Sequence, residues 1–203
     1  RNRPYETVTA LMRIDDLIER MGGITKQLKS FARKNTEGFV PLNFNDAFLS
    51  AMAIMEPQLK QSKVKIETSV SIEPIIIMGD QQRLEQVMIN LFRNALDAVA
   101  TVEQPEIKLS LYKDESAIFS ITDNGNGISN LETLFEPFQT TKDSGKGLGL
   151  GLAISSNIIS ELGGMLQGKN LSSKGAEFKI ILPLFDPSRI TIEEDLKPRK
   201  GSE

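Results

Sequence analysis

Asp123 ends an apolar stretch and is followed by glycine at positions 125 and 127 and then by Ile128. A carboxylate at a strand end can accept a hydrogen bond from an exocyclic amine such as that of a purine. Gly125 and Gly127 would let the backbone approach a flat ring, because no Cβ intervenes, and Ile128 could cover one ring face. The same residues also make a good turn that needs no ligand, and on its own this stretch favours the turn.

Two asparagines, Asn90 and Asn94, stand four residues apart in a stretch that predicts a helix over 80–100, and Gln86 and Asp97 share their face. Asparagine oxygens are neutral, hard ligands that suit a magnesium ion already carrying phosphate charge and several waters. The alternative is an ordinary exposed helix face. The asparagine pair alone does not decide between the two.

A glycine-rich run alternates glycine with lysine or leucine: Gly145, Lys146, Gly147, Leu148, Gly149, Leu150 and Gly151. A helix is predicted to begin within it. Free backbone N–H groups and the positive end of a helix suit phosphate oxygens. The spacing matches neither the dinucleotide-binding glycine pattern nor the P-loop pattern, which excludes both of those readings.

The segment between the two glycine regions contains Phe135 and Phe138, followed by small and polar residues that include Thr141 and Lys142. Two phenylalanines can anchor such a segment. It would then suit a lid that closes over a nucleotide, with Lys142 or Lys146 reaching phosphate. The alternative is a plain surface loop.

Composition excludes several kinds of function. The 203 residues carry a formal net charge of −3, so no global basic field indicates nucleic acid. No apolar run is long enough to cross a bilayer, and we expect no membrane contact from this stretch of chain. There is no cysteine and no histidine, which excludes thiolate metal sites and imidazole catalysis. Any reaction on a histidine must use one from outside this chain.

The predicted elements are mixed. An amphipathic helix over 8–33 has an apolar stripe that needs a partner; it could be a core helix, but we expect coiled-coil or bundle dimerisation because its heptads stop at a linker. The pattern then predicts helices over 45–62, 80–100 and 150–162 and strands over 64–70, 75–78, 107–111, 118–122, 165–168 and 177–184. Hairpins and helical connections together indicate an α+β fold with a mixed sheet and helices on one face.

The order of the motifs resembles the N, G1, F and G2 boxes of sensor histidine kinases, which belong to a superfamily with gyrase B, Hsp90 and MutL. The resemblance covers about residues 45–184. Asn90 stands where the gyrase-like hydrolases place a glutamate base, and Phe135 to Phe138 also favours the histidine kinases. The resemblance implies a two-layer α/β sandwich of the Bergerat type, preceded by one long amphipathic helix.

The resemblance also implies ATP and Mg²⁺ as cofactors. Asp123 would hold adenine, Asn94 and Asn90 would hold Mg²⁺, and Gly145 to Leu150 with Lys142 would close over the triphosphate. The γ-phosphoryl group would pass to a histidine not present in this chain, for relay to an aspartate of a response regulator. The alternatives are a non-catalytic ATP-sensing dimerisation module and a gyrase-type ATPase.

The resemblance divides the chain into four parts. Residues 1–34 would be the second helix of the dimerisation and phosphoacceptor domain, 35–44 a linker, 45–185 the catalytic domain and 186–203 a flexible tail. The sequence of the predicted helix over 8–33 is similar to that of C4-dicarboxylate-type sensors. This similarity implies a homodimer and a cytoplasmic domain of an inner-membrane sensor protein. One departure is Ala176, where threonine is common in the family.

Overall fold

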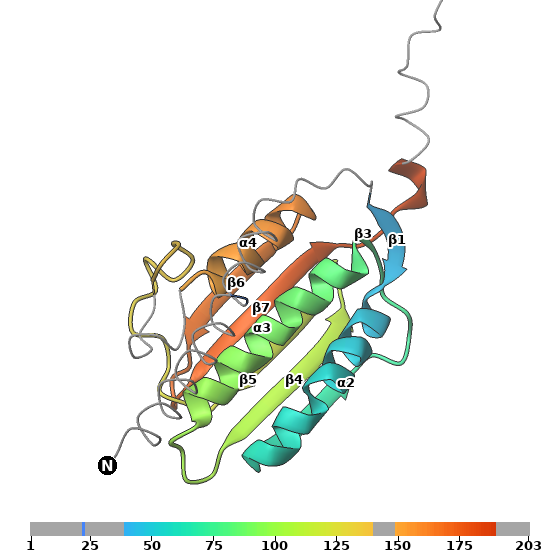
Figure 1. The fold of residues 1–203 in the computed structure, drawn as a ribbon. Coiled ribbons are helices and arrows are strands. Elements are labelled where there is room, and N and C mark those ends of the chain that lie inside the picture. The colour runs from blue at the N-terminus through green and yellow to red at the C-terminus, as the bar shows by residue number, and fades with distance from the viewer. Residues whose placement is uncertain (1–21, 23–38, 140–148, 190–203) are drawn as a thin grey trace, which may run out of the picture.

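The computed structural model describes residue 22 and residues 39–139 and 149–189. The described residues form an α+β fold, with three long helices packed on one side of a five-stranded sheet and a separate two-stranded sheet at one end (Figure 1). The predicted fold class is therefore confirmed, including the placement of the helices on one face.

The main sheet is mixed. Its strands lie in the order β2 (Lys65–Val70), β4 (Glu106–Lys113), β5 (Ser116–Asp123), β7 (Ala176–Pro183) and β6 (Met165–Asn170). β2 and β4 are parallel and all other neighbours are antiparallel. The reason is connectivity: tight turns join β4 to β5 and β6 to β7, whereas β2 reaches β4 through a helical crossover.

The second sheet pairs β1 (Val40–Asn43) with β3 (Ile76–Gly79). The sequence predicted the second of these strands but not its partner, which falls within the segment expected to be a linker. Asn43 explains the arrangement, because its Oδ1 accepts the N–H of Asn45 at 3.3 Å and the N–H of Ile75 at 3.2 Å. One side chain therefore caps the next helix and attaches it to the segment before β3.

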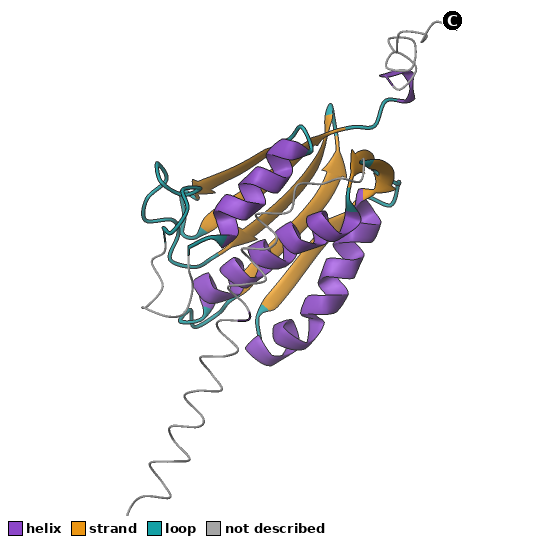
Figure 2. Cartoon of the chain, turned by 45° about the horizontal axis from the view of Figure 1, so that its top comes forward, coloured by secondary structure: helices purple, strands orange, loops and turns teal. Residues whose placement is uncertain are grey.

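The helices α2 (Phe44–Ser62), α3 (Gln81–Val99) and α4 (Gly151–Glu161) lie side by side over one face of the main sheet (Figure 2). α3 is central and contacts both neighbours. Asp80 is its N-cap, since Asp80 Oδ1 accepts the N–H of Arg83 at 3.2 Å. Buried apolar side chains on one stripe of α3 join it to the sheet: Leu84, Val87, Met88, Leu91, Phe92, Ala95 and Val99.

The strands alternate between the two faces of the sheet, as their period of two requires. Ile107, Leu109 and Leu111 of β4 are buried under the helices. On the opposite face, Lys65 Nζ lies 2.6 Å from a Glu67 carboxylate oxygen and Lys108 Nζ lies 3.1 Å from the other. Hydrogen bonds from these two lysines lower the pKa of the exposed Glu67 carboxyl to about 2.

Several predicted segments lie outside the described residues. Of the first predicted helix only Gly22 is described, and it is helical. The expected tail contributes a short 3-10 turn, Pro187–Arg189, before the described part ends. None of the described helices is both long and apolar enough to cross a membrane.

Candidate functional site

Asp123 is the last residue of β5, and its side chain is buried with 4% exposure. Its Oδ1 accepts the N–H of Gly125 at 2.8 Å, and the carboxylate also accepts the N–H of Ala176. Burial raises the pKa of the Asp123 carboxyl above its ordinary value of 3.8, and the two hydrogen bonds oppose that rise. In the described ranges no cation contributes to this balance, so backbone donors alone hold the group.

The glycines after Asp123 are required by close contacts. A Cβ on Gly125 would lie 2.5 Å from the carbonyl oxygen of Ala98, near the end of α3. Gly127 has φ of +76°, in the left-handed region that glycine favours. The loop after Asp123 therefore packs closely against α3. The turn and the purine site, which the sequence offered as alternatives, are formed by the same residues.

Asn90 and Asn94 lie one turn apart on α3, and both are half-buried. Asn90 Nδ2 donates to Ser155 Oγ of α4 at 3.0 Å. Ser155 is buried with 2% exposure. A Cβ on Gly151, the first residue of α4, would lie 2.4 Å from Asn90 Oδ1. Asn90 therefore holds the start of α4 against α3.

The two glycine regions contact the same stretch of α3. Gly151 approaches it at Asn90, and Gly125 approaches it at Ala98. Eight residues of helix span about 12 Å, and Asn94 stands midway between these contacts. The tertiary structure thus gathers the Asp123 loop, the asparagine face and the start of α4, which together span about 60 residues of the sequence from Asn90 to Gly151, around two turns of one helix.

Gly149 and Leu150 precede α4, and Leu150 is its N-cap without a side-chain hydrogen bond. The first intrahelical bond runs from Ile154 N–H to Leu150 O at 2.9 Å, so the N–H groups of the first turn have no helical carbonyl to bond. Gly149 has φ of +66°, and its carbonyl accepts the N–H of Phe138 at 3.1 Å. This bond joins the two ends of the segment that lies outside the described residues.

Six of the predicted site residues fall in that segment: Thr141, Lys142, Gly145, Lys146, Gly147 and Leu148. The phenylalanines that flank it differ from expectation. Phe135 is half-buried and packs against the core, whereas Phe138 is 71% exposed with φ of +65°. The prediction that both anchor the segment is wrong for Phe138, because its side chain is largely exposed and does not pack against the core.

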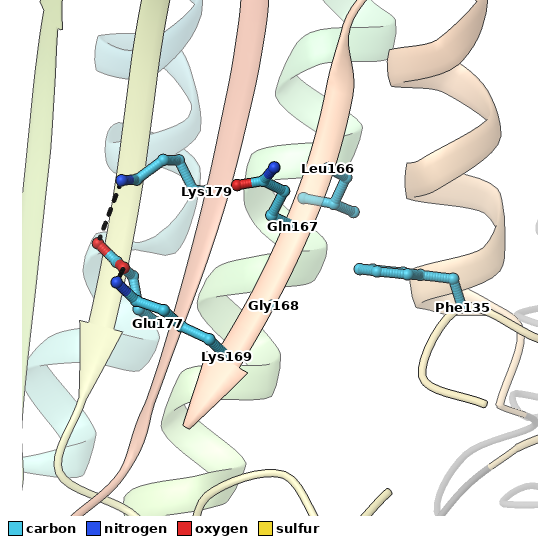
Figure 3. A pocket seen from close by; sticks show the side chains of 7 residues that line it. All are labelled: Phe135, Leu166, Gln167, Gly168, Lys169, Glu177 and Lys179. Carbon is cyan, nitrogen blue, oxygen red and sulfur yellow. Dashed lines mark ion pairs between the residues drawn. The ribbon is translucent and has the colours of Figure 1, made fainter. Parts of the chain in front are cut away.

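A pocket of about 320 Å³ lies beside β6, and its lining includes neither Asp123 nor Asn90 nor Asn94. Figure 3 shows Phe135 and Leu166 on the α4 side of this strand and Lys179, Glu177 and Lys169 on the other. The two lysines already pair with Glu177. The pocket therefore follows the edge of the sheet and does not belong to the predicted site.

The sequence reasoning missed three residues that shape the site. Gly175, with φ of +93°, brings the turn before β7 so close that a Cβ would lie 1.8 Å from the carbonyl oxygen of Asp123. Asn170 bonds the loop at Ile128, and Ser155 bonds Asn90. Gly175 alone carried a signal, as an isolated glycine before a strand.

Comparison with known proteins identifies the family. Residues 79–186 match the family model described as "Histidine kinase-, DNA gyrase B-, and HSP90-like ATPase". The two-component sensor PprA of Pseudomonas aeruginosa is 33% identical over 188 residues, which cover 88% of this chain and 20% of PprA. The C4-dicarboxylate transport sensor protein DctB of Rhizobium meliloti is 36% identical over 168 residues, covering 80% of this chain and 27% of DctB. The chain thus spans less than a third of either relative.

Solved structures agree with this relationship. The catalytic domain of histidine kinase ThkA, in a nucleotide-free form, aligns with a TM-score of 0.63 and 28% identity over 72% of this chain and 96% of that one. ThkA in complex with response regulator protein TrrA aligns with a TM-score of 0.68 and 25% identity, over 85% and 49% of the two chains. The chain belongs to the histidine kinase-, DNA gyrase B- and HSP90-like ATPases, and it is similar to two-component sensors and to the catalytic domain of a histidine kinase.

Proposed function

We propose that this domain binds Mg²⁺–ATP and transfers the γ-phosphoryl group to a histidine outside the chain. The observation that carries the proposal is Asp123, a buried carboxylate held by two backbone N–H groups and by no cation in the described ranges. A buried anion needs further donors, and the exocyclic amine of adenine is a neutral donor that a carboxylate accepts. Gly125, Gly127 and Ile128 would lie against the ring.

Mg²⁺ fits the chemistry of this site only as part of the nucleotide complex. Among the described residues, no group of three or more histidine, cysteine, aspartate or glutamate side chains could hold a metal ion. Mg²⁺ typically uses few protein ligands and takes the rest from phosphates and water. We assign Asn94 as the principal ligand and Asn90 as the second, each through its side-chain oxygen; the Asn90 amide nitrogen meanwhile donates to Ser155.

The first turn of α4, with Gly149 and Leu150, would receive phosphate oxygens through its N–H groups, which have no helical carbonyl to bond. Thr141, Lys142 and residues 145–148 would complete the triphosphate contacts. In this scheme the domain contributes orientation and charge stabilisation to phosphoryl transfer. The chain has no histidine, so the acceptor must come from another segment or protein.

The layout of the whole protein is part of the proposal. Residues 1–34 would be the second helix of a dimeric phosphoacceptor domain, 45–185 the catalytic domain and 186–203 a tail, in a sensor anchored in the inner membrane. The phosphoryl group would pass on to a response regulator. Support comes from the sensors PprA and DctB and from ThkA, whose structure contains the response regulator TrrA.

The test supplies a histidine-bearing phosphoacceptor domain in trans with γ-labelled ATP and Mg²⁺. We expect acid-labile, base-stable phosphate on that domain, and its loss in Asn94→Ala. Asn157→Ala is the matched control, because Asn157 is an exposed asparagine of α4 whose Nδ2 donates to Glu161 at 2.8 Å. Steady ADP release without acceptor labelling would instead indicate a gyrase-type ATPase, and nucleotide binding alone would indicate a sensing module.

A further inference from the structure

Asn170, the last residue of β6, makes two hydrogen bonds to one residue of the loop after Asp123. Its Oδ1 accepts the N–H of Ile128 at 2.6 Å, and its Nδ2 donates to the carbonyl oxygen of Ile128 at 2.8 Å. The primary amide thus satisfies both backbone groups of Ile128, as a neighbouring strand would do. Ile128 and Asn170 are 42 residues apart, so the pair fixes the loop to a different part of the sheet.

The contact extends to Gly127 and to the Ile128 side chain. A Cβ on Gly127 would lie 2.8 Å from Asn170 Oδ1, which means that the loop is seated directly on this amide. The Ile128 side chain lies beside the same strand, because its Cδ1 would be 3.4 Å from a Cβ on Gly168, and it packs against the core. Gly168 belongs to the same strand as Asn170.

The Asp123 end of the loop is held by Ala176, the residue that pairs with Asn170 in the sheet. Asn170 pairs with Ala176 across β6 and β7, and the N–H of Ala176 bonds the Asp123 carboxylate. The turn between these strands is closed by a bond from Leu171 N–H to Gly175 O at 3.0 Å. One hairpin end therefore holds Asp123 through a backbone donor and Ile128 through a side chain.

We propose that Asn170 is a positioning residue for the nucleotide. It sets the distance between the Asp123 carboxylate and the side chain of Ile128, which would cover one face of the purine. This inference rests on the proposed function. A chain segment with several glycines loses much conformational entropy when it orders. Two hydrogen bonds to Ile128 order it before the ligand arrives, and such preorganisation raises affinity.

The experiment measures ATP and ADP affinity of the full chain by calorimetry in the presence of Mg²⁺. We expect Asn170→Ala to weaken both nucleotides about tenfold, as the loss of two neutral hydrogen bonds predicts. The factor should be equal for ATP and ADP, because the contact lies at the purine end. Asn157→Ala should stay within about twofold of the parent.

Hydrogen exchange gives a second readout that does not depend on nucleotide. The Ile128 amide should exchange faster in Asn170→Ala and at the parent rate in Asn157→Ala. A folded Asn170→Ala with parent affinity, or an equal loss in Asn157→Ala, would overturn the inference while leaving the proposed function intact. If the parent chain itself bound no ATP, the proposed function would fail first, which separates the two outcomes.

Discussion

Two carboxylates on neighbouring strands, Asp123 of β5 and Glu177 of β7, differ in how the protein treats their charge. Glu177 lies opposite Thr122, one residue from Asp123, and therefore on the other face of the sheet. Its oxygens lie 2.6 Å from Lys169 Nζ, 2.9 Å from Ser120 Oγ and 3.9 Å from Lys179 Nζ. Asp123 receives backbone N–H groups in place of cations.

The pKa values move in opposite directions as a result. Burial raises the pKa of both carboxyls, but hydrogen bonds from Lys169 and Ser120 and the charges of both lysines outweigh it at Glu177, whose pKa is lowered. At Asp123 burial prevails and the pKa is raised. A structural carboxylate is neutralised by its neighbours. The buried Asp123 carboxylate is instead met by two backbone N–H groups and by no cation among the described residues, which costs stability and leaves acceptor positions for a ligand.

The largest expected effect is on nucleotide affinity. Asp123→Asn keeps an oxygen for the Gly125 N–H but replaces a charged acceptor with a donor. Since hydrogen bonds to charged groups are the strong ones, ATP affinity should fall about 100-fold by calorimetry. Glu177→Gln is the matched control on the other face and should bind ATP as the parent does. Equal losses in both variants would break the distinction between the two carboxylates.

Gly175→Ala tests how closely the hairpin turn supports Asp123. The new Cβ would lie 1.8 Å from the Asp123 carbonyl oxygen, at φ of +93°. Gly163→Ala is the control, because Gly163 has φ of +74° but its nearest neighbour would be Pro183 at 3.8 Å. Urea unfolding should show Gly175→Ala to be less stable than the control by about 2 kcal/mol. Equal stabilities would show that the close approach can relax.

The smallest expected effects are changes in the free energy of unfolding with pH. They should have opposite signs for Asp123→Asn and Glu177→Gln. The raised pKa of Asp123 favours its protonated form in the folded state, so stability from this group is lost as pH rises above 3.8. Asp123→Asn should therefore be more stable than the parent at neutral pH, with a gain that shrinks in acid. Thermal midpoints measured from pH 3 to pH 8 would check this, and Asp114→Asn, in the exposed turn after β4, controls for net charge.

Glu177→Gln should behave in the opposite sense in the same pH series. The lowered pKa of Glu177 gives stability that is present above its ordinary value of 4.5 and is lost as the pH falls. The variant should lose about 1 kcal/mol at neutral pH, and the loss should shrink in acid. If the free energy of unfolding at neutral pH changed in the same direction in Asp123→Asn and Glu177→Gln, the contrast between the two carboxylates would be contradicted.

Most of the fold was predictable because its elements are strongly patterned. The alternation of Ile107, Leu109 and Leu111 predicted β4, and the helix predicted over 80–100 is confirmed as α3. β1 was not predicted, because four residues that include Pro41 give little periodic signal and pair with a strand more than 30 residues away. The second phenylalanine of the lid segment was wrongly expected to anchor it, since a left-handed backbone at Phe138 is not visible in its residue type.

The sequence by itself determined the residue types that can bind a nucleotide and their order along the chain, because those follow from side-chain chemistry and local spacing. The tertiary structure alone decided that Gly125 and Gly151 meet the same two turns of α3, that Ala176 and Gly175 close on Asp123, and that Asn170 holds Ile128. These contacts join segments far apart in the chain. Their geometry depends on strand register and helix packing, which no local pattern specifies.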